Sequence, residues 1–253
     1  GILASIGLVL LDSLWFEKYI IDWNYFDISK SSKNKIRVIQ ISDLHFNKLR
    51  SFHKSIARKI NSLKPDLIFI TGDSVDKTEN IDSLNSFLKL IDESIKKYAI
   101  TGNWEYWGNV DLTKLSKAYS TNNCELLINE NRTISIRNRE ISIIGTDDLV
   151  GGNADFTKAI ENLKHAKTNI VLTHCPAHRD IIAMQKEQLN IDLVLSGHTH
   201  GGQITLLGIA PFKPQGSGNY LKGWYKESEP KMYVSKGIGT SILPIRFGAR
   251  AEI

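Results

Sequence analysis

Five apolar segments of this chain each end on or beside a residue whose side chain carries an oxygen or imidazole donor. The segments are residues 36–42, 66–71, 97–101, 169–174 and 192–197. Short runs rich in β-branched residues are typical of buried strands. In an open α/β sheet, sites form beyond the carboxyl ends of the strands, so we expect the polar residues to converge on one crevice. They are Asp43, His45, Asp73, Asn103, His174, His198 and His200.

Helical patterns separate most of these segments. The alternation of strands and helices predicts an α/β fold with largely parallel, buried strands. A further apolar strand is expected at residues 141–146. The expected helices cover residues 53–63, 81–93, 111–120, 155–164 and 178–188.

The carboxyl-terminal region lacks such helical patterns. Residues 201–207, 231–237 and 249–253 are typical of short strands with no helix between them. This arrangement predicts a second sheet that is antiparallel in part.

The first 35 residues differ in character from the rest. Residues 2–16 are strongly apolar, but Asp12 interrupts them, and the stretch is shorter than the roughly 20 residues that span a bilayer. It is either a packed helix or an interfacial helix left from a membrane anchor. The polar residues 29–35 mark a boundary, so we expect a membrane-proximal segment at 1–35 and a main domain at 36–253.

The charge balance is mildly basic. Lysine and arginine number 32 against 27 acidic residues, which gives a net charge of +5 and favours an anionic partner. No dense basic block interleaved with aromatic residues occurs, so nucleic acid is disfavoured. Cys124 and Cys175 are too few to form a disulfide framework, and we expect free thiols.

The donor set is too large for one tetrahedral zinc ion. Three Asp or Asn oxygens and four imidazoles suit two adjacent divalent ions, drawn from Mn, Fe, Co and Zn, with Mn favoured. One carboxylate must then be shared, and Asp73 is the natural choice because its own loop holds no second candidate ligand. The spacing of Asp43 to His45, and of His198 to His200, lets both members of each pair face the same side of an extended segment.

The motif order D-x-H, G-D, G-N, H and G-H-x-H resembles the calcineurin-like metallophosphoesterase superfamily, from about residue 36 to the end. The runs SGHTHGGQITL and YVSKGIGTSILPIRFGARAEI are similar to its membrane-associated branch, which includes YkuE-type phosphodiesterases and UDP-2,3-diacylglucosamine pyrophosphatases. The resemblance implies an αββα sandwich, in which two mixed β-sheets are flanked by helices and a dimetal site lies at the carboxyl ends of the strands. By the same likeness, one ion is held by Asp43, His45, Asp73 and His200, and the other by Asp73, Asn103, His174 and His198.

The implied activity is metal-dependent hydrolysis of a phosphoester, by in-line attack of a hydroxide that bridges the ions. Asp73, Asn103 and His174 are the expected catalytic residues. The expected substrate is a lipid-linked phosphodiester or pyrophosphate such as UDP-2,3-diacylglucosamine, met at the cytoplasmic face of a membrane or by an exported protein. The alternatives are a soluble phosphodiesterase for nucleotides or small esters, and a scaffold without activity.

The segment after the last histidine bears on the substrate. Residues 205–227 mix apolar side chains such as Phe212 and Trp224 with lysines such as Lys213 and Lys222. They form either a plain surface connection or a lid for an amphiphilic phosphate.

Trp104 departs from the family pattern, because many members carry a histidine after the G-N pair. An indole has no basic nitrogen, so Trp104 can only donate one hydrogen bond to a phosphoryl oxygen. Either the leaving group is a good one, or Glu105 or His178 serves as the acid. Arg246 is a phosphate clamp or a structural ion-pair partner, and His178 is otherwise a surface residue at the start of a helix.

Overall fold

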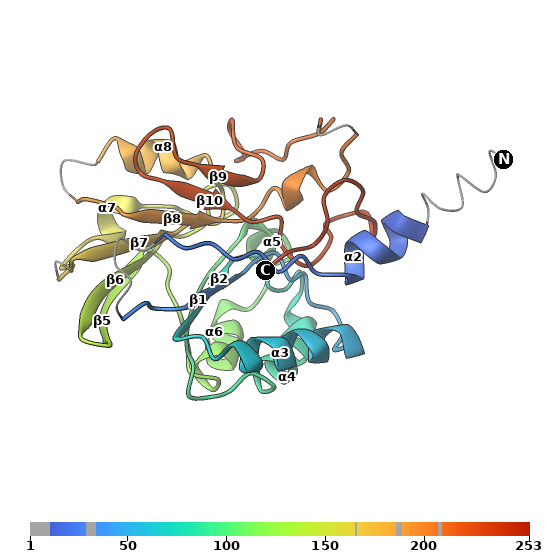
Figure 1. Cartoon of the computed structure of the whole chain (residues 1–253), viewed down its shortest axis with the longest axis horizontal. Helices are drawn as coiled ribbons and strands as arrows, with labels where there is room; N and C mark the ends of the chain where they lie inside the picture. Colours follow the sequence, from blue (N-terminus) through green and yellow to red (C-terminus); the bar gives the residue numbers. More distant parts are fainter. Residues whose placement is uncertain (1–10, 29–33, 165, 186–188, 207–208) are drawn as a thin grey trace.

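Two β-sheets pack face to face, with helices on their outer surfaces (Figure 1). This computed structural model describes residues 11–28, 34–164, 166–185, 189–206 and 209–253. The first sheet has the order β1-β2-β3-β4 and is wholly parallel. Its strands are β1 (Val38–Ile41), β2 (Leu67–Thr71), β3 (Lys96–Ile100) and β4 (Cys124–Leu126).

The second sheet is mixed and has the order β5-β6-β7-β8-β10-β9. Strands β6, β7, β8 and β10 run parallel, while β5 and β9 pair antiparallel at the two edges. The strands are β5 (Glu130–Ile136), β6 (Arg139–Gly145), β7 (Thr168–Leu172), β8 (Leu193–Ser196), β9 (Gly223–Tyr225) and β10 (Met232–Val234). The expected pair of sheets flanked by helices is therefore confirmed. The first sheet is wholly parallel, whereas a mixed sheet was expected.

The core lies in three layers that follow from the continuous apolar character of the strands. Phe69 and Tyr98 of the first sheet share one cluster with Ile143 and Leu172 of the second, which fills the space between the sheets. The opposite strand faces pack against the helices on each side. Each inner strand is thus buried on both faces, which explains the near-continuous apolar runs.

The helices cover the outer faces, and two of them begin at an aspartate cap. Asp111 accepts the N–H of Lys114 at 3.0 Å, and Asp155 accepts that of Lys158 at 2.9 Å. Such caps satisfy N–H groups that have no partner within the helix. The helices are α2 (Glu17–Tyr19), α3 (Ser51–Leu63), α4 (Ile81–Leu88), α5 (Asn103–Trp107), α6 (Leu112–Ser120), α7 (Phe156–Ala159) and α8 (His178–Ala183), with helical turns at Asp12–Phe16, Thr78–Asn80 and His200–Gly202.

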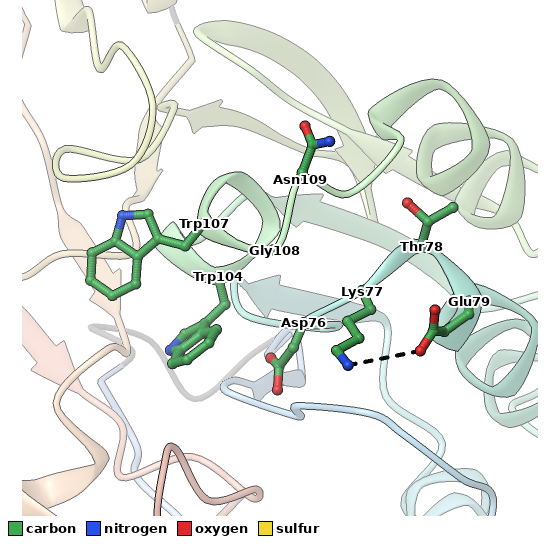
Figure 2. A pocket seen from close by; sticks show the side chains of 8 residues that line it. All are labelled: Asp76, Lys77, Thr78, Glu79, Trp104, Trp107, Gly108 and Asn109. Atoms are coloured by element: carbon green, nitrogen blue, oxygen red, sulfur yellow. Dashed lines mark ion pairs between the residues drawn. The ribbon is translucent and has the colours of Figure 1, made fainter.

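The helix boundaries differ from the expected ones mainly by being shorter. Helix α7 ends at Ala159 and α8 at Ala183, and residues 186–188 of the expected last helix lie outside the described residues. Helix α5 was not expected, and its two tryptophans, Trp104 and Trp107, project from it (Figure 2).

Two of the three expected carboxyl-terminal strands are absent from the described residues. Residues 231–237 contain β10, as expected. Residues 201–206 instead hold a helical turn and a bridge from Ile204 to Phe247, because Gly201 and Gly202 take positive φ angles of 63° and 86°. Residues 249–253 form only an isolated bridge between Glu252 and Asp22, since that part of the chain pairs with the amino-terminal segment.

The described part of the amino-terminal segment packs against the main domain. The N–H of Asp22 donates to the carbonyl of Ala251 at 2.9 Å, and the ring of Phe26 lies 5.0 Å from that of Tyr233. Ile21 and Trp23 contact the core under the first sheet. The division at residue 35 stays a prediction.

The apolar residues 11–16 form one short turn that continues into α2. In the described ranges of the chain, no helix is both long enough and apolar enough to cross a bilayer. The membrane-associated location expected from residues 2–16 is therefore wrong. Residues 2–10 of that stretch lie outside the described residues.

His53 is packed rather than solvated. In α3 its ring lies 4.4 Å from that of Phe46, and its Nδ1 accepts the N–H of Arg50 at 3.1 Å. Burial, together with the charge of Arg50, lowers the pKa of His53 to about 4. His165 lies outside the described residues.

The lowered pKa of His53 predicts a loss of stability in mild acid. The unfolded chain binds the proton near pH 6.5 and the folded chain only near pH 4, so the contribution is complete above pH 6.5 and lost as the pH falls toward 4. As the pH falls through this window, the free energy of unfolding should decrease more steeply in the wild type than in His53→Gln. The difference in slope should be up to about 1 kcal/mol per pH unit. Urea denaturation at pH 7 and pH 5 measures this, and equal pH dependence of both proteins would contradict it.

Candidate metal centre

Loops at the carboxyl ends of five strands bring seven buried side chains to one place. Asp43 and His45 follow β1, Asp73 follows β2, and Asn103 begins α5 directly after β3. The second sheet supplies His174 after β7, and His198 and His200 after β8. The crevice therefore lies where the strand ends of both sheets meet, as expected from the position of polar residues after apolar runs.

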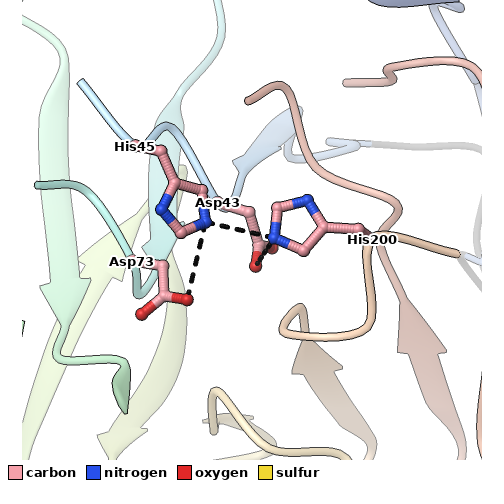
Figure 3. Close-up of side chains that lie close together, drawn as sticks. All are labelled: Asp43, His45, Asp73 and His200. Carbon is pink, nitrogen blue, oxygen red and sulfur yellow. Dashed lines mark hydrogen bonds and ion pairs between the residues drawn. The ribbon is translucent and has the colours of Figure 1, made fainter. Parts of the chain in front are cut away.

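One group of donors consists of Asp43, His45, Asp73 and His200 (Figure 3). The Nε2 atoms of His45 and His200 are 3.1 Å apart. Nε2 of His45 is 3.7 Å from Oδ2 of Asp73, and Nε2 of His200 is 3.4 Å from Oδ1 of Asp43. One donor atom from each residue lies within 4.8 Å of all the others, close enough for a single cation to contact the four.

The second group contains Asp73, His174 and His198, with the amide of Asn103 beside them. Oδ2 of Asp73 is 3.1 Å from Nε2 of His174. Oδ1 of Asn103 is 2.9 Å from Nδ1 of His198 and 3.2 Å from Nε2 of His174. Asp73 belongs to both groups, so its carboxylate lies between them.

Three imidazoles are held from behind by an oxygen acceptor. Nδ1 of His45 donates to Asp76 at 2.6 Å, Nδ1 of His174 to the carbonyl of Thr71 at 2.8 Å, and Nε2 of His198 to the carbonyl of Gln215 at 2.6 Å. Since the outer nitrogen carries the proton, the inner nitrogen of each neutral ring presents a lone pair to the crevice. Imidazole lone pairs that face buried carboxylates form a donor set that fits divalent cations.

Most of the loops that carry these donors have strained backbones. Asp43, His45, Asp73, His198 and His200 all have φ between 44° and 74°, which is the left-handed region. Residues other than glycine seldom adopt this region, and each instance costs of order 1–3 kcal/mol. Five such residues in one crevice indicate that the surrounding loops hold the donors in place against that cost.

Two glycines are required because side chains of the metal donors lie too close to their Cα atoms to leave room for a Cβ. Gly72 has φ of 87°, and a Cβ there would lie 2.5 Å from Nδ1 of His174. A Cβ on Gly102 would lie 2.3 Å from Oδ1 of Asp73. Any side chain at either position would displace a donor, which explains the G-D and G-N pairs of the sequence.

Glu105 links the loop after β2 to the loop after β3 through hydrogen bonds to their backbones. Its Oε1 accepts the N–H groups of Ser74 and Val75 at 2.6 and 3.2 Å. Its Oε2 accepts those of Gly102 and Asp73 at 2.8 and 3.1 Å. Burial and the nearby charge of Asp73 raise the pKa of Glu105 to about 8. With both oxygens engaged by backbone, this carboxyl group positions the loops.

In the crevice, the carboxylate of Asp73 and the imidazole of His174 stabilise each other's charged forms. Burial by itself would raise the pKa of Asp73, but the charge of His174 and its hydrogen bond hold the pKa below the usual range. Burial opposes the charged form of His174 as well, and Asp73 nonetheless raises its pKa. The pKa of Asp43 is raised, first by burial. Two buried carboxylates at close range are costly unless positive charge lies between them.

The profile of the calcineurin-like phosphoesterase family matches residues 36–202, which contain all seven donors. The chain belongs to this family. It is similar over 231 residues to the uncharacterized metallophosphoesterase YkoQ of Bacillus subtilis, at 28% identity with 88% of this chain and 83% of that protein covered. It is 30% identical to YkuE of the same organism, covering 86% of this chain and 77% of that protein.

A bovine relative is larger than this phosphoesterase. It is described as a transmembrane protein with a metallophosphoesterase domain, and it is 30% identical over 239 residues, which are 88% of this chain and 52% of that protein. Among solved structures, the 5′-nucleotidase precursor of Thermus thermophilus matches with a TM-score of 0.51 at 13% identity, covering 80% of this chain and 49% of that one. TT1561 of the same organism has a TM-score of 0.51 at 13% identity, covering 81% and 91%. These structural likenesses concern the fold alone.

Its membership of this family makes the protein a metal-dependent phosphohydrolase, and the structure confirms the expected α/β sandwich.

The three residues expected to bind substrate lie in different settings. Trp104 is half-buried at the rim, its backbone N–H donates to Oδ1 of Asp73 at 2.9 Å, and its ring meets that of His45 edge-on. His178 is only 1% exposed, its Nδ1 is 3.0 Å from Oγ1 of Thr173, and burial lowers its pKa to about 4. Their roles stay predictions.

Arg246 is fully buried. Its guanidinium donates to the carbonyls of Lys236, Gly239 and Ala249 at 2.8, 2.9 and 2.8 Å, and Nη2 is 3.3 Å from Nδ1 of His200. Burial lowers the pKa of Arg246 to about 10. The side chain joins carboxyl-terminal loops behind His200, and its action as a phosphate clamp stays a prediction.

Two contacts of this centre were missed in the sequence. Asp76 holds His45, and its only signal is a second acid three residues after Asp73 in the run GDSVD. The carbonyl of Gln215 holds His198, and a backbone group leaves no signal in a residue pattern.

Proposed function

We propose that this phosphoesterase hydrolyses a phosphodiester or pyrophosphate bond with two divalent cations held by the seven donors. The observation that carries the proposal is the position of Asp73, whose Oδ2 is 3.7 Å from His45 and 3.1 Å from His174. A carboxylate shared by two groups of donors is the arrangement that a pair of cations requires.

The proposed division of the donors follows the two groups. Asp43, His45, Asp73 and His200 hold one cation, and Asp73, Asn103, His174 and His198 hold the other. Mixed oxygen and imidazole donors suit Mn, Fe, Co or Zn, and Mn is our first choice. When bound, the cations supply an activated water and offset charge on the phosphoryl group.

The protein side chains position that chemistry. We assign the catalytic roles to Asp73, Asn103 and His174, since Nε2 of His174 lies 3.1 Å from Oδ2 of Asp73 and 3.2 Å from Oδ1 of Asn103. The indole of Trp104 cannot protonate a leaving group, and Glu105 is engaged by backbone N–H groups. This favours a leaving group that departs without a proton donor, such as a phosphate or an activated alcohol.

We infer that the substrate is amphiphilic, with UDP-2,3-diacylglucosamine as one candidate. The segment whose Gln215 carbonyl contacts His198 also carries Phe212, which is 70% exposed, and Ile209, which is 72% exposed. Exposed apolar side chains on a segment attached to the centre offer a surface for an apolar substituent. The alternative is a phosphodiesterase for nucleotides or small water-soluble esters.

The test is a hydrolysis screen of chelator-treated protein supplied in turn with Mn²⁺, Fe²⁺, Co²⁺ or Zn²⁺. Substrates are p-nitrophenyl phosphate, methyl p-nitrophenyl phosphate, bis-p-nitrophenyl phosphate and UDP-2,3-diacylglucosamine in mixed micelles. We expect turnover only with metal, and preference for the diesters or the pyrophosphate over the monoester. No hydrolysis with any metal refutes the function, while faster turnover of the small diesters than of the micellar substrate favours the alternative.

A further inference from the structure

A hollow of about 550 Å³ lies beside the metal centre (Figure 2). Two tryptophans of α5 line it, together with polar residues of the segment after β2. None of the seven metal donors lines it. The lining residues are Asp76, Lys77, Thr78, Glu79, Trp104, Trp107, Gly108 and Asn109.

His45, one of the metal donors, lies between the hollow and the other donors of its group. Nδ1 of His45 contacts Asp76, which lines the hollow, and Nε2 of the same ring is 3.1 Å from His200. The ring of Trp104 is 6.0 Å from that of His45. Because Asp76 and Trp104 line the hollow and both lie against His45, the hollow adjoins the centre on the side of this ring.

Trp107 is a large side chain of this lining that the protein leaves exposed. It is 56% exposed, and its ring lies 5.7 Å from that of Trp104 at an angle of 67°. An indole is a large apolar surface that is usually covered, and its face is a platform on which nucleobases stack. Lys77 and Glu79 also line the hollow and form an exposed ion pair at 3.9 Å, so polar groups are available to the edge of a bound ring.

We propose that this hollow binds a nucleobase carried by the phosphoester, stacked on Trp107. The proposal rests on the proposed function and narrows the substrate class to phosphoesters that contain a nucleoside. Trp104 lines the hollow and also contacts Asp73 of the metal centre, so it lies between the base site and the phosphoryl site.

Isothermal titration calorimetry of Mn²⁺-supplied protein tests the base site directly. The two probes are adenosine 5′-monophosphate and ribose 5-phosphate, which share the phosphate and the sugar and differ in the base. Stacking of one base contributes about 1–3 kcal/mol, so the nucleotide should bind about tenfold more tightly or better. In Trp107→Ala the ratio of the two dissociation constants should fall to about twofold or less, and Trp107→Phe should retain most of it.

A matched control is Trp15→Ala, because Trp15 is 59% exposed and lies in the turn Asp12–Phe16, outside the hollow. This variant should keep the wild-type ratio. The proposal is overturned if the wild type binds the two probes equally or binds neither. It is also overturned if the ratio is unchanged in Trp107→Ala or is lost in Trp15→Ala.

Hydrolysis of methyl p-nitrophenyl phosphate separates this result from the proposed function. That ester carries no nucleoside, so its turnover reports on the metal centre and the binding ratio reports on the hollow. Absence of turnover with a high binding ratio refutes the hydrolytic function and supports the base site. Turnover with a binding ratio near one supports the hydrolytic function and refutes the base site.

Discussion

Replacement of Asp73 by asparagine is expected to lower kcat for a phosphodiester by roughly 10³-fold. The amide keeps the shape of the carboxylate but loses the charge that both donor groups share, and a metal centre supplies several kcal/mol of transition-state stabilisation. Each 1.36 kcal/mol lost is about tenfold in rate. Oδ2 of Asp73 lies within 3.7 Å of histidines from both groups, so no other single side chain replaces it.

The measurement pairs kcat with metal content, determined by elemental analysis after gel filtration. The wild type should retain about two equivalents of metal and Asp73→Asn fewer. Asp82→Asn is the control, because Asp82 is an exposed carboxylate in the first turn of α4. Full activity and full metal content in Asp73→Asn would show that the shared-carboxylate assignment is wrong.

Replacement of Glu105 by glutamine is expected to reduce the free energy of unfolding by about 2–6 kcal/mol. The four N–H groups that the carboxyl accepts lie in two loops, at residues 73–75 and at Gly102. The amide nitrogen of glutamine would face two of them as a donor, which leaves two buried N–H groups without an acceptor at about 1–3 kcal/mol each. The same loops carry Asp73 and Asn103, so metal affinity should fall as well.

Urea denaturation and calorimetric titration with Mn²⁺ measure the two effects. The control is Glu93→Gln, an exposed position at which the change should stay within about 0.5 kcal/mol. A Glu105→Gln protein with wild-type stability and metal affinity would show that the loops hold their positions without this anchor.

The donors were predictable because each of them lies next to a strand in the chain. An apolar run that ends at a Gly-Asp or Gly-Asn pair is a local pattern, and it placed Asp73 and Asn103 at strand ends. The same reasoning erred at residues 201–206, where two glycines of positive φ turn the chain away from an extended path. It also expected a membrane-associated location, because apolar character by itself does not reveal that the described residues 11–16 form only a short helical turn.

The acid expected for the leaving group shows the limit of residue spacing. Glu105 lies two residues after Asn103, which is close enough in the chain to suggest a chemical role. In the fold, the first turn of α5 directs the side chain toward the loop after β2, where backbone N–H groups occupy it. The partner of a buried carboxyl group is set by neighbours that are distant in the chain, and spacing does not report them.

The sequence alone determined the kinds of donor, their order and their place at the ends of buried strands, since these depend on contacts within a few residues. Only the tertiary structure decided that Asp73 lies between the two donor groups, that Asp76 and the Gln215 carbonyl orient two histidines, and that a hollow with two tryptophans adjoins them. The physical reason is that these distances are fixed by how the two sheets pack and how their loops meet. That packing is a sum over the whole core, which no single stretch of residues contains.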